Sequence, residues 1–395
     1  MLTTALLPKI QAELKAQSVD GWLLFDFRGT NAIAGGLLGV EGLASRRMFA
    51  WIPRDGTPTA VQHAIEPGPW RHWPTEWNKE IYSSWKTLEG TLAKLIKGKR
   101  IAMEYSAGDA VPYLDRIPAG VIEMVRAAGA EVVSSGHLVS KFYAVWTPEN
   151  VASHERAAEI IAKVAKEAFR MIGERSRSAK PATEFEMMQW IQGRFKAAGL
   201  ETDHGPNVSV GPNSADSHYE PTAEKSLTIG ENQVVLIDLW ASEKHGVHPY
   251  ADQTWMAFTG KNPPEKVVKV WETLREARDA AIKIVVDNAA KQQSIAGAAA
   301  DDAARQIIEA RGFGQYFTHR TGHSIDSREL HGSGPHLDNL ETREERLLIP
   351  GVGFSIEPGI YMRGDFGMRT EVNVYITPER AVVTPGDIQR ELFLV

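Results

Sequence analysis

Four carboxylic acids and one histidine in the second half of the chain stand beside short apolar segments and could together bind metal. They are Asp238, Asp252, His323, Glu357 and Glu371. Carboxylate oxygens with a single imidazole suit two bridged Mn²⁺, Co²⁺ or Zn²⁺ ions, whereas a structural zinc site is usually rich in thiolates. The chain contains no cysteine, which excludes thiolate ligands and disulfides. If the five side chains converge, we expect a metal-dependent hydrolase.

The two aspartates are expected on neighbouring strands. Asp238 ends the apolar run 234–237, which the pattern predicts to be a buried strand. A carboxylate buried there needs a cation or hydrogen-bond donors, because an unpaired buried charge is costly. Asp252 precedes the strand-like run 254–258, and the turn residue Gly246 between the aspartates predicts a hairpin.

The two glutamates also adjoin predicted strands. Glu357 follows the apolar run 353–356 and is itself followed by proline and glycine. Glu371 begins the run 371–376, whose alternation places it on the same face as Asn373. Any one of these acids could equally be a surface or salt-bridged residue. The occurrence of all five residues at strand ends favours a shared metal site.

Six segments, in this order, are similar to motifs of the pita-bread metallopeptidases, which include methionine aminopeptidase, aminopeptidase P and prolidase. The segments are 218–219, 236–238, 251–254, 321–325, 355–361 and 367–371. The resemblance implies that the five residues named above are metal ligands for two divalent cations, with Asp252 and Glu371 lying between both ions. It also implies an extra N-terminal domain like that of the creatinase/prolidase branch.

Three further histidines lie in or near these motifs. Many histidines are structural, but the motif context favours a catalytic role for His218, His319 and His331. Imidazoles at these positions could hold the scissile carbonyl and stabilise the oxyanion by hydrogen bonding. We assign Glu357 a second, catalytic role, which is to take a proton from the attacking water and return it to the leaving nitrogen.

Two arginines are assigned to substrate binding. Arg343 stands fourteen residues before Glu357, where the resemblance implies an arginine that holds the free carboxylate of a dipeptide, and Arg346 is an alternative. The guanidinium fork suits that task. The segment 341–346 is equally typical of a solvated charged turn. Arg369 is expected to support the metal-binding carboxylates from a position two residues before Glu371.

The resemblance implies hydrolysis of the peptide bond before proline. We expect a Xaa-Pro dipeptidase (prolidase), whose partners are proline-containing dipeptides or short peptides. One alternative is a Xaa-Pro aminopeptidase that acts on longer peptides. Two others are a metal-free C–N hydrolase like creatinase and a noncatalytic binding protein of the same fold, and the intact set of five ligands argues against both.

The chain departs from the family pattern at a few positions that could affect substrate choice. Its two aspartates are fourteen residues apart, about three more than is usual in the family. Trp240 stands where glycine is common and Trp255 where arginine is common, and Ser324 and Asp326 replace glycines. None of these changes removes an expected ligand.

Composition and charge are compatible with this function. The 395 residues are 43% hydrophobic and 24% charged, which is ordinary for a globular protein, and the net charge of −6 offers no basic surface for nucleic acid or anionic membranes. The N-terminal residues lack a signal-peptide pattern, and no apolar run is long enough to span a membrane. We expect a cytoplasmic protein and, from the resemblance, a homodimer.

Periodicity and turn residues predict two domains with an overall α+β fold. Residues 1–146 are expected to form a small α/β domain with strands at 21–27, 48–53 and 100–104 between helices at 5–17, 87–96 and 119–128. Residues 147–395 are expected to form a helix-covered antiparallel sheet, the pita-bread fold, with helices at 147–172, 184–198, 264–287 and 299–311. A cluster of aromatics, Trp70, Trp73, Trp77, Tyr82 and Trp85, either packs on itself or reaches the active site of a partner subunit.

Overall fold

The computed structural model describes residues 1–42 and 44–395, and these residues separate into two units. The first unit is Met1–Tyr143 and the second is Ala144–Val395. Both combine helices with sheets. The sequence places the domain boundary slightly later, after residue 146, just before the Thr147 side chain caps the first helix of the second unit.

The N-terminal unit contains one sheet with strand order β4-β3-β2-β1-β5-β6. Its strands are β1 (Gly21–Asp26), β2 (Met48–Pro53), β3 (Thr59–His63), β4 (Asn78–Tyr82), β5 (Arg100–Met103) and β6 (Glu131–Ser134). Its helices are α1 (Leu7–Ala16), α2 (Ala32–Leu38), α3 (Trp85–Ile96), α4 (Ala119–Ala127) and α5 (Gly136–Phe142). The predicted α/β alternation is therefore confirmed.

The sequence of β1 explains why helices cover both faces of this sheet. Successive side chains of a strand point to opposite faces. Trp22 and Leu24 join one hydrophobic cluster with residues of α1, α2 and α5, whereas Leu23 and Phe25 join a second cluster with residues of α3 and α4. Because all of β1 is buried, its run of apolar residues needs cover on both sides.

The aromatic cluster near β4 packs largely on itself. The rings of Trp70 and Trp77 each contact Trp73 edge-on, with centroid distances of 5.4 and 5.0 Å, and all three are buried. Tyr82 is buried as well, while Trp85 is 59% exposed. Self-packing accounts for the three tryptophans Trp70, Trp73 and Trp77, whereas Tyr82 packs in the cluster on the other face of the sheet, beside His63. The homodimer stays a prediction.

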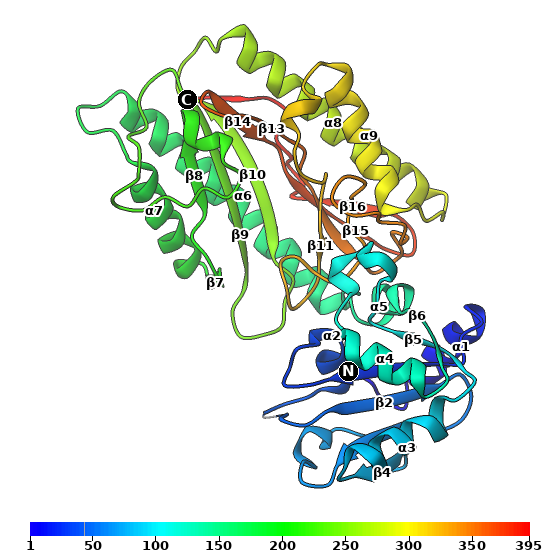
Figure 1. The fold of residues 1–395 in the computed structure, drawn as a ribbon. Coiled ribbons are helices and arrows are strands. Elements are labelled where there is room, and N and C mark those ends of the chain that lie inside the picture. The colour runs from blue at the N-terminus through cyan, green and yellow to red at the C-terminus, as the bar shows by residue number, and fades with distance from the viewer. Residues whose placement is uncertain (43) are drawn as a thin grey trace. The chain divides into compact units, whose positions relative to one another are not determined.

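The C-terminal unit contains four long helices and three sheets (Figure 1). The helices are α6 (Pro148–Ser176), α7 (Glu184–Ala197), α8 (Glu265–Ala290) and α9 (Gly297–Ala310). The first sheet has β7 (Leu200–Glu201), β8 (Asn207–Val210), β9 (Val234–Glu243), β10 (Ala251–Phe258) and β17 (Phe393–Leu394). The second has β11 (Ser324–Ile325), β12 (Gly353–Ile356), β15 (Val372–Ile376) and β16 (Ala381–Thr384), and the third pairs β13 (Gly359–Met362) with β14 (Phe366–Arg369).

The helices bury apolar stripes against these sheets. Residues of α6 and α7 share one cluster with β8, β9 and β10, and residues of α8 and α9 share another with strands from all three sheets. In α8 the buried positions Val267, Val270, Leu274, Ala277 and Ala281 recur every three or four residues, which is the spacing of one helix face. All four helices predicted for this unit are confirmed, to within a few residues at their ends.

The predicted hairpin is β9–β10, and its register corrects one expectation. Asp238 lies inside β9 and does not end it, because the strand continues to Glu243 while paired with β10. Thr254 pairs with Asp238, and Asp252 pairs with Trp240. All four therefore share one face of the hairpin. Among residues 1–42 and 44–395, no helix is long and apolar enough to cross a membrane.

Candidate metal centre

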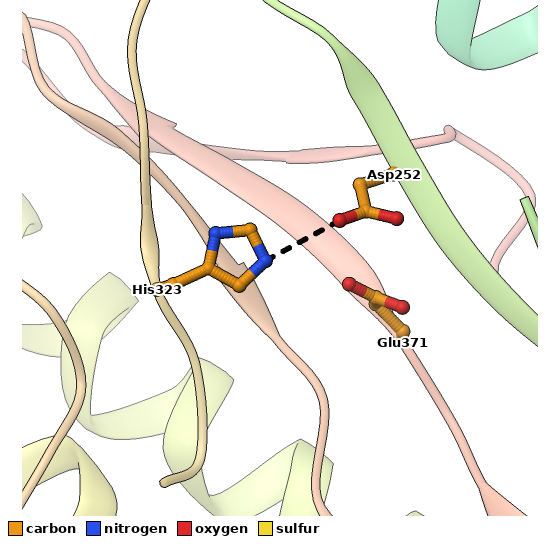
Figure 2. Close-up of side chains that lie close together, drawn as sticks. All are labelled: Asp252, His323 and Glu371. Carbon is orange, nitrogen blue, oxygen red and sulfur yellow. Dashed lines mark ion pairs between the residues drawn. The ribbon is translucent and has the colours of Figure 1, made fainter. Parts of the chain in front are cut away.

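Asp252, His323 and Glu371 form the centre of the site (Figure 2). Each offers one ligand atom, these atoms all lie within 4.8 Å of one another, and all three side chains are buried. Nε2 of His323 is 3.3 Å from Oδ2 of Asp252. The three residues come from β10, from the segment directly before β11 and from the segment directly before β15. Residues far apart in the sequence thus meet where the sheets adjoin.

Asp252 is held where β10 meets β15. Its backbone N–H donates to Oδ1 of Asn373, at 2.9 Å, and Asn373 pairs in turn with Ser355 of β12. The backbone N–H of Glu371 donates to the carbonyl of Thr254, at 3.2 Å. These bonds join the hairpin to the second sheet and fix the backbone on both sides of the two carboxylates.

His323 is oriented by its neighbours so that one ring nitrogen faces the acids. Its backbone N–H donates to Oγ of Ser355, and the backbone N–H of Ser355 donates to the carbonyl of His323, both at 2.9 Å. Nδ1 lies 3.1 Å from the carbonyl oxygen of Ser324. Because a carbonyl oxygen can only accept, Nδ1 carries the hydrogen in the neutral ring, which leaves the lone pair of Nε2 facing Asp252. This is the tautomer that a metal ligand requires.

Asp238 and Glu357 join the same cluster. Oε1 of Glu357 is 3.4 Å from Nε2 of His323 and accepts a hydrogen bond from Oγ of Ser355, at 3.0 Å. Oδ1 of Asp238 lies 3.2 Å from the hydroxyl of Thr254. The five side chains singled out in the sequence are therefore brought together.

Arg369 lies among the carboxylates. Its guanidinium forms an ion pair with Asp238 and lies 3.9 Å from one oxygen each of Glu357 and Glu371. Nε donates to the hydroxyl of Thr254, at 2.8 Å, and that hydroxyl donates to Oε2 of Glu371, at 2.7 Å. Although burial opposes the charge, the neighbouring carboxylates raise the pKa of Arg369 well above its ordinary value. The guanidinium is thus a permanent partial counter-charge for the acids.

The charge balance of the site favours bound cations. Burial, with repulsion from neighbouring carboxylates, raises the pKa of Asp238 to about 6, raises that of Asp252, and raises that of Glu371 well above its ordinary value. Glu357 differs: burial would raise its pKa, but electrostatic attraction from the nearby His323 and Arg369 lowers it to about 2. One arginine does not offset four buried acids.

The geometry of Glu371 also fits a metal ion. Its Oε1 atom is buried and has no hydrogen-bond partner among the described residues. A buried carboxylate oxygen without a donor is costly, and a dication would compensate it. Together with the exposed lone pair on Nε2 of His323, this oxygen makes the donor set suitable for divalent ions.

The three candidate catalytic histidines lie in different surroundings. The His331 ring is exposed, with its centroid 4.2 Å from that of His323, and His323 and partial burial lower its pKa to about 3. Nδ1 of His319 is 2.6 Å from the Arg320 carbonyl, and its Nε2 is 2.9 Å from the hydroxyl of Tyr361. Both nitrogens of His319 are therefore engaged within the protein, whereas the side chain of His331 is available to a ligand.

His218 lies in an exposed loop that a buried carboxylate organises. Its backbone N–H donates to Asp216, at 3.1 Å. Glu184, at the start of α7, accepts hydrogen bonds of 2.7 Å from the backbone of Val210 and Leu227 and from the hydroxyl of Tyr219. These bonds tie both ends of the loop and the residue next to His218 to one carboxylate.

The structure does not bring Arg343 to the acids. Its side chain is 72% exposed and lies 3.6 Å from Glu345, and no described contact within residues 1–42 and 44–395 joins it to the cluster. Arg346 is buried, forms an ion pair with Glu344 and donates to the carbonyls of Ser333 and Gly334. The segment thus has the form of a charged turn, and the role of Arg343 in substrate binding stays a prediction.

Sequence reasoning missed several residues that hold the ligands in place. Thr254, Ser355 and Asn373 bond directly to ligand residues, and Tyr361 connects His319 with Arg369. The spacing of three of these residues in the sequence could have identified them. Thr254, Ser355 and Asn373 each lie two residues from a ligand, on the same strand face, where a polar side chain would otherwise be buried without purpose.

Comparison with known proteins agrees with this geometry. Residues 152–378 match the profile of metallopeptidase family M24. A putative Xaa-Pro aminopeptidase of Mycoplasma pneumoniae is 31% identical over 62% of this chain and 63% of its own length, and a Xaa-Pro dipeptidase of Lactobacillus helveticus is 34% identical over 42% and 40%. The matched regions thus cover less than two thirds of either relative.

A solved structure shows the same fold over both units. The crystal structure of dipeptidase PepE from Mycobacterium ulcerans is 21% identical, covers 100% of this chain and 99% of its own, and has a TM-score of 0.74. The predicted α+β fold, with a pita-bread C-terminal domain and a smaller N-terminal α/β domain, is confirmed. Because the family profile covers more than half of the chain, the protein belongs to metallopeptidase family M24.

Proposed function

We propose that this protein hydrolyses the peptide bond before proline and that Xaa-Pro dipeptides are its main substrates. The observation that carries the proposal is the buried cluster of Asp252, His323 and Glu371, joined to Asp238 and Glu357, in a chain of family M24. The names of the relatives, a Xaa-Pro dipeptidase and a putative Xaa-Pro aminopeptidase, support the choice of a proline-containing substrate.

Five residues would hold two divalent cations: Asp238, Asp252, His323, Glu357 and Glu371. The central position of Asp252 and Glu371 in the cluster and the unpartnered Oε1 of Glu371 support their part in this set. Two such ions, when bound, lower the pKa of water and polarise a carbonyl group. Manganese is our choice of metal, with cobalt or zinc as alternatives, since oxygen-rich ligands suit all three.

The chain's own residues would move the protons and orient the substrate. Glu357 would be ionised at neutral pH, because its pKa is lowered to about 2 beside His323 and Arg369, and an ionised carboxylate can accept a proton from water. The proline nitrogen carries no hydrogen in the peptide bond, and it must receive one when the bond breaks. Glu357 would deliver that proton.

Two histidines would donate hydrogen bonds to the reacting carbonyl. His331 is the better placed, because its ring lies beside His323 and its nitrogens face no described partner within the chain. His218 would act from the facing loop. His319, whose nitrogens are both engaged, would act mainly by holding the Tyr361 hydroxyl. The directional donors then stabilise negative charge on the carbonyl oxygen.

Substrate preference tests the proposal. Proline release from a Xaa-Pro dipeptide should be compared with cleavage of the matching Xaa-Pro-Xaa tripeptide by protein loaded with Mn²⁺. We expect faster turnover of the dipeptide. Cleavage of the tripeptide without the dipeptide would instead establish the aminopeptidase alternative. If neither peptide is cleaved by fully loaded protein, the proposal is wrong.

Glu357→Gln provides the matched control for the same assay. The variant should lose about 10²–10⁴-fold in kcat, since it cannot carry a proton, while its circular dichroism spectrum is unchanged. Metal analysis should find two ions per chain in the wild-type protein. Less than about one ion per chain would leave no two-metal site and would favour the metal-free hydrolase or the binding protein.

The proposed carboxylate clamp can be tested with one variant and two substrates. If Arg343 binds the free carboxylate of a dipeptide, Arg343→Ala should raise KM for the dipeptide but not for the dipeptide amide, which lacks that charge. Equal effects on both substrates would remove Arg343 from the proposed site. The homodimer and the cytoplasmic location likewise stay predictions made from the sequence.

A further inference from the structure

The loop that carries His331 is organised around a buried aspartate. Asp326 is 1% exposed, although it lies in the irregular segment after β11. It is one of the positions where the sequence departs from its family, with an acid in place of glycine. We propose that Asp326 is a positioning residue that fixes His331 beside His323, an inference that rests on the proposed function for its effect on catalysis.

The Asp326 carboxylate accepts three hydrogen bonds from the backbone of its own loop. Oδ1 accepts from the N–H groups of Arg328 and Glu329, at 2.8 and 2.9 Å. Oδ2 accepts from the N–H of Ser333, at 3.0 Å. One carboxylate therefore holds the loop before and after His331. A buried charge requires such compensation, and here the backbone supplies all of it.

Backbone contacts close the loop at the same place. The N–H of Gly332 donates to the carbonyl of Ser324, at 2.7 Å, and the N–H of Asp326 donates to the carbonyl of Glu329, at 3.3 Å. A Cβ atom at Gly332 would lie only 2.7 Å from the backbone nitrogen of Asp326 and 2.9 Å from its carboxyl carbon. Only glycine permits this approach, so the residue after His331 is pressed directly against Asp326.

His331 depends on this loop for its position. Its ring is exposed, and no hydrogen bond of its side chain is described among residues 1–42 and 44–395. The ring nevertheless lies 4.2 Å from the ring of His323, which is bound into β11 and β12 through Ser324 and Ser355. Because no side-chain hydrogen bond of His331 is described, the clamped backbone on either side is the contact that we infer fixes its place. A shift of about 1 Å in a reacting group can cost about 10²-fold in rate.

A double-mutant cycle separates positioning from a general structural role. His331→Ala should lower kcat about 100-fold, as loss of one oxyanion donor does, and Asp326→Ala should lower it about 10–100-fold. In the His331→Ala background, Asp326→Ala should change kcat by less than about twofold, because the group it positions is already absent. If the two losses multiply in full, Asp326 does not act through His331 and the proposal is overturned.

Two further variants control for folding. Asp26→Asn removes the charge from a second buried aspartate, which accepts from the backbone of Gly29 and Asn31 in the N-terminal unit, and it should leave kcat unchanged. If Asp326→Ala fails to fold, Asp326→Asn replaces it in the cycle. Asparagine keeps the acceptor for Arg328 and Glu329 but places an NH₂ group opposite the N–H of Ser333, so the clamp opens on one side.

An activity-independent measurement distinguishes failure of this inference from failure of the proposed function. In a spectrum of protein labelled at histidine, the ring resonance of His331 is shifted by the nearby His323 ring. It should move toward its value in an unfolded chain in Asp326→Ala and stay in place in Asp26→Asn. An unmoved resonance overturns the inference. If wild-type protein cleaves no Xaa-Pro peptide, the proposed function fails, and this spectrum alone decides the role of Asp326.

Discussion

Replacing Arg369 by methionine should destabilise the metal-free protein, and the loss should depend on pH. The guanidinium is buried and touches Asp238, Glu357 and Glu371, so its removal leaves three acids without their counter-charge. Removing one partner of a buried ion pair typically costs about 3–5 kcal/mol. We expect a loss of this size in the free energy of unfolding at pH 7.5, measured in EDTA.

The loss should shrink in mild acid. Burial raises the pKa of Asp238 to about 6, and Arg369 acts against this rise, so the pKa lies higher still in the variant. A carboxyl group whose folded pKa exceeds its unfolded value stabilises the fold at low pH and loses that effect as the pH rises. One proton over two pH units corresponds to at most about 2.7 kcal/mol. The difference between variant and wild type should therefore fall by about 1–2.7 kcal/mol between pH 7.5 and pH 5.5.

Urea unfolding at the two pH values measures this change, and Arg278→Met supplies a control. Arg278 is also a buried arginine, but it donates to Thr370 and to the carbonyl of Gln389, and its acidic partner Asp279 is half exposed. Arg278→Met should lower the free energy of unfolding by a similar amount at both pH values. An equal loss for Arg369→Met at pH 7.5 and pH 5.5 would refute the view that Arg369 compensates ionised carboxylates.

Three other outcomes are expected. Each divalent cation, at 100 times its dissociation constant, should stabilise the protein by about 2.7 kcal/mol, so two ions should contribute about 5.4 kcal/mol and raise Tm, and excess EDTA should reverse the shift. Burial lowers the pKa of His154 to about 4, so the unfolded chain takes up a proton at this residue before the folded protein does, and the wild type loses stability as the pH falls from 6.5 to 4. His154→Gln, which has no such proton to bind, should lose less free energy of unfolding over the same range. Glu184→Gln should lower kcat/KM about 10-fold by loosening the loop of His218, with no further loss when His218→Ala is already present.

The helices and the clustering of the five candidate ligands were predictable because each has a local signal. Thr147 caps α6 by accepting from the N–H of Asn150, and Pro148 occupies the first turn, and both are local signals of a helix start. The apolar spacing of α8 fixes its buried face without reference to the rest of the fold. An acidic residue beside an apolar run is likewise a local signal, because a buried carboxylate without a cation or hydrogen-bond donors is so unfavourable.

Roles that depend on contacts between distant segments could not be read in the same way. Arg343 precedes a candidate ligand by fourteen residues and Arg369 precedes one by two, and the first is 72% exposed whereas the second is buried among acids. Tertiary placement separates them, and composition does not. The same holds for His319, whose partner Tyr361 lies on β13. Sequence spacing identified these residues as candidates but did not determine which of them face the substrate.

The register of the β9–β10 hairpin decides which sequence departures can matter. Pairing of Ala241 with Ala251 confines the extra residues to the turn, so fourteen residues between the aspartates still leave Asp238 and Asp252 on one face. By the same alternation Trp255 points to the opposite face, where its ring stacks on Phe393 with centroids 5.9 Å apart. Trp240 shares the face of the aspartates, with its indole held by Asp203 at 2.7 Å. Of the two tryptophan departures, Trp240 is therefore the one that lies on the face of the aspartates.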